Sequence, residues 1–429
     1  MSYKETLNFL YSLQKYGIKF GLDNTHKLLS YLDNPQSKFK SIHIAGTNGK
    51  GSTATLIASI LREMNYRVGL YTSPHLVKFN ERIQVNGTMI SDDELVEYTQ
   101  LLKHQVESIK PTFFEVTTSI AFKYFADQKV DFAVIETGLG GRLDSTNVIV
   151  PELSVITSIG FDHTDMLGDT LEKIAFEKGG IIKQNVPVIV GFNHDPVKQI
   201  LFKTCLEKNA SCTDVQFLYD LEALEKSFPS MQLKINSQKT GKVYNLVSLL
   251  YGEFQINNLI TSIASVETLS LNETNFITKV ENGIKNLHRN FLFQGRFQRI
   301  SQQPLIIIDT SHNSSAFESF IYEVNDLKVN NRIAVFGVMK DKEISDSLNL
   351  ICGTFDEIFT CCAKTMRAIT SSELASKFNN PVKVFDGKSV ANAIELALTS
   401  CEKDSAVFIF GSNYVVGEAL EHLESKKLE

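Results

Sequence analysis

The sequence predicts an α/β protein built from two parallel-sheet units, and three observations support this fold class. A glycine-rich loop separates a short apolar run from a helical pattern at Ile42–Leu61. Further apolar runs alternate with helical patterns after it, which is typical of a parallel sheet covered on both faces. A second series of such runs follows Phe291–Arg299, so we expect a second, smaller doubly wound unit in the C-terminal part.

Composition and charge limit the classes of protein to which the chain can belong. Its 429 residues are enough for two or three domains with buried cores. A formal net charge of −6 and a pI near 5.9 give no electrostatic case for nucleic acid binding. No apolar stretch is long enough to span a membrane, and the N-terminal residues mix charges into a helical pattern, unlike a signal peptide. The six cysteines have no zinc-type spacing, so we expect a cytoplasmic protein with reduced thiols.

An N-terminal unit is predicted over residues 1–293, and its first elements can be assigned in order. Residues 1–40 have the apolar spacing of one or two helices. Ser91-Asp92-Asp93-Glu94 is a capping box with an acidic first turn, which predicts the start of another helix. The other elements predicted here are strands at Tyr66–Tyr71 and Val130–Ile135, an alternating segment with a turn at Phe79–Ile90, and a helix at Phe114–Asp127.

The later part of the chain continues the alternation and contains the predicted boundary between the two units. Residues 294–299 are predicted as a hinge, with Gln294 and Gly295 as the residues that change conformation, and residues 300–429 as the C-terminal unit. Before the hinge we expect a strand at Leu153–Ile159, a hairpin formed by Met231–Asn236 and Lys242–Val247, and helices at Asn257–Leu269 and Thr274–Leu287. After it we expect strands at Leu305–Asp309, Ile333–Gly337, Glu357–Cys361, Val382–Phe385 and Ala406–Phe410, with helices at Val390–Leu398 and Tyr414–Leu423.

The loop Gly46–Ser52 is the clearest candidate for a binding site. A glycine loop between a strand and a helix directs backbone N–H groups and a helix N-terminus at one point, which suits a polyphosphate. Lys50 would place a positive charge on the phosphate oxygens, and the Ser52 hydroxyl would bind Mg²⁺. The alternative is a flexible surface turn rich in small residues. The generic phosphate-loop pattern differs at two positions, which Ile44 and Gly51 occupy here.

Polar residues that follow neighbouring strands predict a metal site beside this loop. Ser73, Glu136 and His163 each come at or shortly after the end of an apolar strand. Because ligands of parallel sheets bind beyond the carboxyl ends of the strands, we expect these side chains and Ser52 to gather at one edge. Hydroxyl and carboxylate oxygens suit Mg²⁺, and one neutral imidazole nitrogen can complete its coordination. The alternatives are a hydrogen-bonded structural histidine at His163 and a helix-cap or ion-pair role for Glu136.

A set of motifs in this order resembles one enzyme family. The segments are Gly46–Ser52, Thr72–Leu76, Phe79–Ile83, Glu136–Asn147, Asp162–Gly168, Glu177–Ile181, Gly295–Phe297, Asp309–Asn313 and Gly411–Tyr414. Together they resemble the folylpolyglutamate synthase and dihydrofolate synthase family, a branch of the Mur ligase superfamily. The resemblance runs from about Phe20 to Gly417. It implies a central P-loop ATPase domain and a smaller Rossmann-like C-terminal domain.

The activity that this resemblance implies is ATP-driven amide formation. A pteroate or folate carboxylate would take the γ-phosphoryl group of ATP, and the amine of L-glutamate would then attack the acyl phosphate. The implied catalytic residues are Lys50, His312 and Lys178, of which Lys178 matches a family lysine that is carbamylated and can support a second Mg²⁺ ion; an ordinary salt-bridging lysine is the alternative. The ATP contacts implied by the loop and the resemblance are Thr47, Asn48, Gly49, Lys50, Gly51, Ser52, Asn258, Arg296 and Asp309, and the implied metal ligands are Ser52, Ser73, Glu136 and His163.

The resemblance also implies a pterin site and shows where this chain departs from the family pattern. The segments that match contacts to dihydropteroate contain Phe20, Gly21, Leu22, Thr112, Phe113, Phe114, Glu115, Arg142, Leu143 and Asp144. Asn24 replaces a basic residue near these segments, which bears on pterin selectivity. Gln294 replaces a proline, and Thr310, Ser311 and Ser314 replace small or rigid residues, which bears on how the two units close.

Two other functions remain as alternatives. One is a Mur-type peptidoglycan ligase, against which the Gly138–Asp144 and Thr72–Leu76 motifs argue. The other is a folate- or nucleotide-binding homologue with impaired catalysis, which the altered Asp309–Ser314 stretch suggests. For the leading hypothesis the expected partners are small molecules, namely dihydropteroate, tetrahydrofolates or both together with L-glutamate, and the chain is expected to act as a monomer without nucleic acid or membrane partners.

Overall fold

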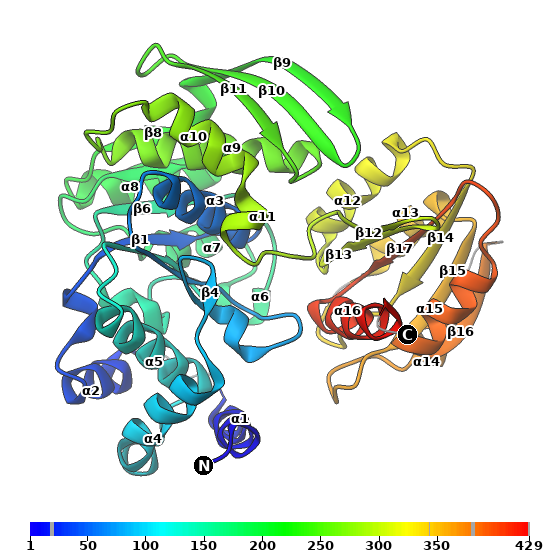
Figure 1. The fold of residues 1–429 in the computed structure, drawn as a ribbon, viewed down its shortest axis with the longest axis horizontal. Coiled ribbons are helices and arrows are strands. Elements are labelled where there is room, and N and C mark those ends of the chain that lie inside the picture. Colours follow the sequence, from blue (N-terminus) through cyan, green and yellow to red (C-terminus); the bar gives the residue numbers. More distant parts are fainter. Residues whose placement is uncertain (18–20, 343, 379–381, 428–429) are drawn as a thin grey trace.

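The computed structural model describes residues 1–17, 21–342, 344–378 and 382–427 of the chain. Two α/β units lie side by side, and a small antiparallel sheet stands at the top of the first unit in Figure 1. The predicted α/β class, with a large mostly parallel sheet and a second C-terminal sheet, is confirmed. No helix in the described ranges is long and apolar enough to cross a membrane.

The large sheet has eight strands in the order β4-β3-β2-β5-β1-β6-β7-β8. Six of them run parallel, and β3 and β4 form an antiparallel hairpin at one edge, with its turn at Asn86-Gly87 as predicted. The strands are β1 (Lys40–Ala45), β2 (Val68–Tyr71), β3 (Ile83–Val85), β4 (Thr88–Met89), β5 (Phe132–Glu136), β6 (Leu153–Ile156), β7 (Val188–Val190) and β8 (Cys212–Asp214). The ends of β1, β2, β5 and β6 therefore meet at one edge, where the predicted site residues follow them.

Helices cover both faces of this sheet because successive strand residues point to opposite sides. In β5, Val134 packs into the core with α3, whereas Ala133 and Ile135 pack into the core with α5. The helices of this unit are α1 (Tyr3–Ser12), α2 (Asp23–Tyr31), α3 (Lys50–Glu63), α4 (Asp92–Ile109), α5 (Phe113–Asp127), α6 (Thr164–Leu167), α7 (Leu171–Gly179), α8 (Asp195–Glu207), α9 (Glu253–Thr268), α10 (Phe276–Lys285) and α11 (Leu287–Asn290). Short 3₁₀ turns are η1 (Leu13–Tyr16), η2 (Pro35–Ser37), η3 (Phe79–Arg82), η4 (Ser145–Val148) and η5 (Val215–Phe217).

Local sequence signals start several of these helices where they were expected. The capping box before α4 is confirmed, because the Ser91 hydroxyl accepts from the Glu94 N–H at 3.2 Å and Glu94 Oε2 accepts from the Ser91 N–H at 2.9 Å. The helix predicted from Phe114 starts one residue earlier, at Phe113, because Thr112 and Glu115 form a second capping box. Each box satisfies backbone N–H groups that the first turn of a helix leaves free.

The small sheet contains the predicted hairpin and one strand that was not predicted. Its order is β11-β10-β9, with β9 (Tyr219–Ser227), β10 (Ser230–Ser237) and β11 (Val243–Ser248) all antiparallel. Most side chains of β9 are exposed, and the apolar alternation of its first residues, Tyr219–Ala223, breaks down at Leu224 and the charged residues that follow. The buried side of the sheet packs on α9, where Glu267 accepts hydrogen bonds from Tyr219 and Tyr244.

The C-terminal sheet has six strands in the order β12-β13-β17-β14-β15-β16, parallel except for β12. The strands are β12 (Gln298–Gln302), β13 (Leu305–Asp309), β14 (Asn331–Phe336), β15 (Glu357–Cys362), β16 (Lys383–Ser389) and β17 (Ser405–Phe410). The helices are α12 (Ser314–Asp326), α13 (Ser345–Thr354), α14 (Ser371–Ser376), α15 (Val390–Thr399) and α16 (Asn413–Lys427). Strand β12 was not predicted, and it begins inside the segment 294–299 that was expected to be a hinge. The hinge and the domain limits stay predictions.

The two units touch through a continuous core and one close backbone contact. Phe297 stacks on Tyr251 of the first unit at 5.6 Å between ring centroids and packs edge-on against Phe320 at 5.7 Å. Leu76, in the loop after β2, lies against α16, where a Cβ added at Gly417 would stand 2.1 Å from the Leu76 carbonyl oxygen. This contact leaves no room for any side chain at position 417.

Candidate active site

The glycine-rich loop connects β1 to α3 and keeps the geometry that its sequence predicts. Gly49 has φ of 85°, a left-handed conformation that residues with a Cβ adopt rarely, and a Cβ there would stand 2.3 Å from Asn258 Oδ1. The helix α3 begins at the next residue, Lys50, so the loop directs the free N–H groups of the helix N-terminus into the space beyond the sheet. This arrangement suits an anion.

Two lysines converge on one carbonyl of this loop. Lys50 Nζ donates to the carbonyls of Gly46 at 3.0 Å and Thr47 at 3.1 Å, and Lys178 Nζ donates to the same Gly46 carbonyl at 2.7 Å. Lys178 comes from α7 and is buried. Burial, together with the neighbouring Lys50 charge, lowers the pKa of Lys178 to about 7. Lys178 therefore holds a neutral amine for part of the time near neutral pH.

The predicted metal ligands lie along the same cavity as the loop. Glu136, at the end of β5, is buried, and its Oε2 accepts a hydrogen bond from the Ser73 N–H at 3.1 Å. Burial raises the pKa of Glu136, although the charge of Lys50 opposes that rise. Ser52 and His163 line the cavity as well. The described part of the chain contains no cluster of three or more His, Cys, Asp and Glu that could hold a metal, and this donor set fits Mg²⁺, which takes few protein ligands and keeps water and phosphate oxygens.

The C-terminal unit contributes the opposite wall. Asp309, at the end of β13, accepts from the N–H groups of Phe297 and Ser311, each at 2.7 Å, and from the Ser311 hydroxyl. The altered residue Ser311 thus fixes the Asp309 carboxylate, and the altered residue Thr310 donates its hydroxyl to the Gly295 carbonyl at 3.1 Å. Burial raises the pKa of Asp309 in spite of the nearby Arg296 charge. Both departures from the family pattern therefore make contacts that hold this wall together.

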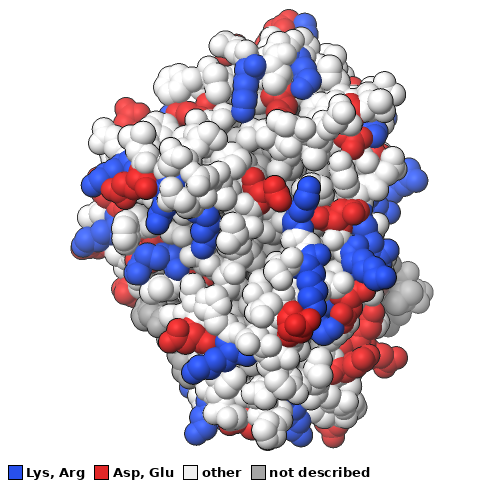
Figure 2. Space-filling model, turned by 90° about the vertical axis from the view of Figure 1, so that its left-hand side faces the viewer, with Lys and Arg blue, Asp and Glu red and all other residues white. Residues whose placement is uncertain are grey.

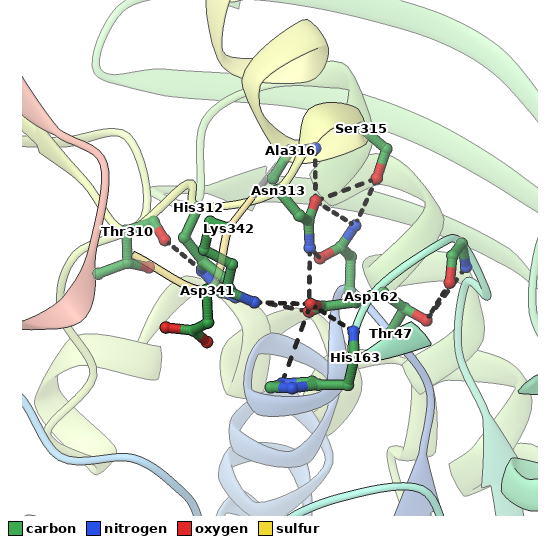
Figure 3. Close-up of polar contacts among 12 residues, drawn as sticks. Thr47, Asp162, His163, Thr310, His312, Asn313, Ser315, Ala316, Asp341 and Lys342 are labelled. Atoms are coloured by element: carbon green, nitrogen blue, oxygen red, sulfur yellow. Dashed lines mark hydrogen bonds and ion pairs between the residues drawn. The ribbon is translucent and has the colours of Figure 1, made fainter. Parts of the chain in front are cut away.

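Asp162 connects the two walls, as Figure 3 shows. It lies in the loop after β6, and its carboxylate accepts from Lys342 Nζ of the C-terminal unit at 2.6 Å. His312 Nε2 lies 3.7 Å from the same carboxylate, and Asn313 Nδ2 donates to it at 3.4 Å. Burial would raise the pKa of Asp162, but the nearby His312 and the charges of His163 and Lys342 hold it well below its ordinary range.

A second set of contacts joins the glycine-rich loop directly to the C-terminal unit. Asn313 Nδ2 donates to Asn48 Oδ1 at 3.1 Å, and Asn48 Nδ2 donates to the Ser315 hydroxyl at 2.8 Å. On the first unit, Asn258 is held by a hydrogen bond from its Nδ2 to Gln255 Oε1 at 2.8 Å. The amide of Asn258 therefore keeps one orientation beside Gly49.

These groups surround one cavity of about 500 Å³ with residues from both units. Every residue predicted to bind ATP or metal or to take part in catalysis lines it: Thr47, Asn48, Gly49, Lys50, Gly51, Ser52, Ser73, Glu136, His163, Lys178, Asn258, Arg296, Asp309 and His312. Their separate roles stay predictions, but their common location agrees with a nucleotide and an acyl acceptor that meet in one place.

The predicted pterin residues lie outside the lining of this cavity. Phe20 lies outside the described residues, and none of Gly21, Leu22, Thr112, Phe113, Phe114, Glu115, Arg142, Leu143 and Asp144 lines the cavity. Glu115 accepts from Asn24 Nδ2 at 3.3 Å, and Arg142 forms an ion pair with Glu177 at 2.8 Å. Phe113 stacks on Tyr11 at 5.7 Å between centroids and lies 5.4 Å from the Arg82 guanidinium, which does line the cavity.

Several residues of the cavity were not singled out from the sequence. Arg82 and Asp162 lie inside two of the sequence motifs described above. Each is a charged residue with an apolar neighbour in the chain, and this signal could have identified it as a site residue. Nothing in the sequence around Lys342 marked it, because its role depends on how the two units meet.

On the face shown in Figure 2, basic and acidic side chains are interspersed and form no patch of one sign.

Comparisons with known proteins agree with the site. The Mur ligase middle domain matches residues 44–266, and the Mur ligase glutamate ligase domain matches residues 295–413. A Bacillus subtilis relative named dihydrofolate synthase/folylpolyglutamate synthase is 34% identical over 99% of both chains. Among solved structures, Mycobacterium tuberculosis folylpolyglutamate synthase complexed with ADP has a TM-score of 0.90 and 27% identity, covering 98% of this chain and 99% of that one.

A further solved structure extends this comparison. Escherichia coli FolC in complex with DHPP and ADP has a TM-score of 0.86 and 28% identity, covering 98% of each chain. The order of the motifs and the cavity between the two units agree with these comparisons. The chain therefore belongs to the Mur ligase family, in the branch of the dihydrofolate and folylpolyglutamate synthases.

Proposed function

We propose that this protein is an ATP-dependent ligase that joins L-glutamate to the carboxylate of a pteroate or folate. The observation that carries the proposal is that Lys50 of the glycine-rich loop and His312 of the C-terminal unit line the same cavity. Lys50 would contact the phosphates of a nucleotide, and His312 would lie near the incoming amine. The named activity of the relatives supports the same reaction class.

The reaction needs two steps because a carboxylate is a poor acyl donor. In the first, a carboxylate oxygen of the pterin substrate attacks the γ-phosphorus of ATP, ADP leaves, and an acyl phosphate forms. In the second, the amine of glutamate attacks the carbonyl carbon, phosphate leaves, and the nitrogen loses a proton. Lys50 would stabilise the charge on the transferring phosphoryl group, which is worth about 10²–10³ in rate for one preorganised contact.

Ser52, Ser73, Glu136 and His163 would hold a Mg²⁺ ion beside the loop. It would neutralise negative charge on the phosphate oxygens of the nucleotide. The protein's own contribution is to hold these donors in place: the Ser73 N–H orients the Glu136 carboxylate, and the end of β5 places it next to Lys50.

Lys178 would carry a carbamate in the working enzyme. A carbamate forms when a neutral amine attacks CO₂ and loses a proton, and a pKa near 7 makes the neutral amine available at physiological pH. The resulting anion would stand beside Lys50 and could support a second Mg²⁺ ion.

The choice between dihydropteroate and tetrahydrofolates depends on the segments outside the cavity, around Phe113 and Asn24. Both activities occur in the names of the relatives, including forms that combine them. We propose that the chain accepts both, and that it acts as a monomer, because one chain supplies both walls of the cavity.

One assay tests this function. ADP release is measured with dihydropteroate, with tetrahydrofolate, or with a UDP-linked muramoyl peptide, each with and without L-glutamate, and the amide product is followed by mass spectrometry. We expect amide product and ADP with the two pterins and glutamate only, and Lys50→Met as the control should lose activity by about 10²–10³. Absence of product with both pterins, or product with the muramoyl peptide, would overturn the proposal.

A further inference from the structure

The loop that follows β6 carries two residues of the candidate site. It extends from Thr157 to His163, and its last two residues, Asp162 and His163, line the cavity (Figure 3). Asp162 accepts from Lys342 of the C-terminal unit, and His163 is a predicted metal ligand. Strand β6 ends at Ile156, so the regular pairing of the sheet stops before this loop begins. Other contacts therefore have to determine the path of the loop.

On one side, the loop pairs with the glycine-rich loop. The Ser158 carbonyl accepts from the N–H groups of Thr47 at 2.8 Å and Asn48 at 3.3 Å. The Thr47 hydroxyl donates to the Gly160 carbonyl at 3.0 Å and accepts from the Gly160 N–H at 3.1 Å. The Thr157 hydroxyl donates to the Asn48 carbonyl at 2.8 Å. These contacts fix the spacing between the phosphate-loop candidate and the loop that ends in His163.

On the other side, the loop is held by the side chain of Asn193, which lies between β7 and α8. Asn193 Oδ1 accepts from the Ile159 N–H at 2.8 Å. Its Nδ2 donates to the carbonyls of Thr157 at 3.0 Å and Gly191 at 3.1 Å. A primary amide supplies one acceptor and two donors from one planar group, so asparagine satisfies all three backbone groups at once.

Asn193 stands apart from the cavity and reaches it through the chain. It does not line the cavity, although its neighbour Phe192 does. The buried residue Ile159, whose N–H it holds, precedes His163 by four residues. His163 has a φ of 50°, a left-handed conformation that is uncommon for residues with a Cβ. Such a conformation persists where the surrounding contacts hold the chain in place, and the bonds of Asn193 belong to these contacts.

Resting on the proposed function, we propose that Asn193 is a positioning residue for the ligase reaction, because it fixes the loop that places His163 and Asp162. His163 would then stand beside the glycine-rich loop, where the magnesium nucleotide binds, and Asp162 would face Lys342 across the cavity. Without the Asn193 bonds, the Ile159 N–H and the Thr157 carbonyl lose their partner, and the loop can take other paths. Nucleotide binding and the closure of the two units should suffer together.

The first test follows the loop itself in the metal-free chain. Asn193→Asp keeps the shape and the acceptor for the Ile159 N–H, but it places a carboxylate oxygen against the carbonyls of Thr157 and Gly191. Amide hydrogen exchange is measured by mass spectrometry on the full chain without Mg²⁺ or nucleotide. We expect exchange in peptides that cover residues 157–163 to become about tenfold faster or more, as for the loss of one net hydrogen bond. Peptides from α4 should exchange as in wild type.

The second test distinguishes positioning from a general loss of structure. Steady-state rates are measured with dihydropteroate, L-glutamate and MgATP. In Asn193→Asp we expect the KM for MgATP to rise about tenfold, with a higher ratio of ADP to amide product. The KM for dihydropteroate should change less than about twofold. A smaller fraction of folded protein would instead lower kcat and leave both KM values and the ratio unchanged.

Two further variants control for the chemical change. Asn193→Ala removes the three bonds without adding a charge, so it should shift both readouts in the same direction. Asn209→Asp makes the same replacement at the opposite ends of β7 and α8, where Asn209 Nδ2 donates to Asn185 Oδ1 at 2.7 Å between exposed residues. It should leave both readouts at their wild-type values.

The outcomes separate this inference from the proposed function. If both Asn193 variants leave the exchange of residues 157–163 unchanged, or lower kcat with the same KM for MgATP and the same product ratio, Asn193 does not position the site. If wild type forms no amide with any pterin, the proposed function is wrong. The role of Asn193 in the ligase reaction then falls with it, although hydrogen exchange still decides whether Asn193 fixes the loop.

Discussion

At the scale of single residues, the chemistry of the site depends on how Lys50 and Lys178 share the Gly46 carbonyl. Two cations this close disfavour each other, and the more deeply buried one, Lys178, gives up its proton more easily. Burial and the neighbouring Lys50 thus make Lys178 an amine that can be neutral near pH 7, while Lys50 lies in the loop predicted to bind phosphate. The lowered pKa cannot be read from a lysine in a sequence, because it follows from burial.

The lowered pKa of Lys178 predicts how stability changes with pH. The folded chain has this pKa near 7 and the unfolded chain near its ordinary 10.5, so between these values the unfolded chain binds more protons. The free energy of unfolding should therefore gain a rising contribution from pH 7 upward, at most about 1.4 kcal/mol per pH unit. Urea unfolding in CO₂-free buffer at pH 7, 8 and 9 measures it, and Lys178→Met should remove this contribution.

Lys198 provides the matched control. It is also buried, but it forms an ion pair with Asp214 at 3.0 Å. Lys198→Met should leave the pH dependence of the wild type in place. If Lys178→Met shows the same slope as wild type, the Lys178 amine is not neutralised by folding.

At the scale of elements, one buried carboxylate of α9 adds a polar anchor to the apolar packing between this helix and the small sheet. Glu267 accepts from the hydroxyls of Tyr219 at 2.5 Å, Tyr244 at 2.6 Å, Thr240 at 2.6 Å and Ser237 at 2.9 Å. Burial and the bond to Glu267 raise the pKa of both tyrosines, so they stay protonated donors. Helix α9 also carries Asn258, so this anchor helps to fix one side of the cavity.

Replacing Glu267 should therefore destabilise the first unit. Glu267→Leu leaves the three buried hydroxyls of Tyr219, Ser237 and Tyr244, and that of the exposed Thr240, without their acceptor. We expect a loss of about 2–5 kcal/mol in the free energy of unfolding by urea. The control is Glu222→Leu, an exposed partner of Lys234 on the same sheet, which should cost less than about 1 kcal/mol. Equal losses in the two variants would contradict the role of Glu267 as an anchor.

At the scale of the whole molecule, Asp162 and Lys342 hold the two units over the cavity. Both side chains are 11% exposed, so their ion pair is screened less by water than a surface pair. Asn48 adds neutral contacts to Asn313 and Ser315. An acyl phosphate needs such closure, because water competes with the amine for the same carbonyl carbon.

Breaking this pair should uncouple ATP use from amide formation. Lys342→Met leaves the Asp162 carboxylate buried without its nearest cation, which costs about 3–5 kcal/mol for a buried pair and favours separation of the units. We expect a higher ratio of ADP to amide product, and a larger radius of gyration by solution scattering with ATP analogue and pteroate bound. Lys340→Met, an exposed neighbour that donates to the Met366 carbonyl, is the control. Unchanged scattering and coupling in Lys342→Met would show that the pair does not hold the units together.

Much of the molecule could be predicted from its sequence, and the exceptions have physical reasons. Local signals sufficed where one element carries its own pattern, as in the capping box of α4 and the loop before α3. The strands β9 and β12 were missed because these edge strands are rich in polar side chains and neither keeps an apolar alternation over its full length. Lys342 was missed for another reason: its partner Asp162 lies on the other unit, and no local pattern reports a contact of that kind.

The contact between Leu76 and Gly417 limits which residue the chain can carry at position 417. A methyl group at position 417 would collide with the Leu76 carbonyl. The two units can therefore lie this close together only because glycine has no Cβ. A mutation from glycine to alanine there would change none of the predicted catalytic or binding residues, but it would push on Leu76, which lines the cavity, and so force the walls apart. The width of the cavity therefore depends on a glycine that is not part of its lining, one helical turn beyond Asn413 and Tyr414.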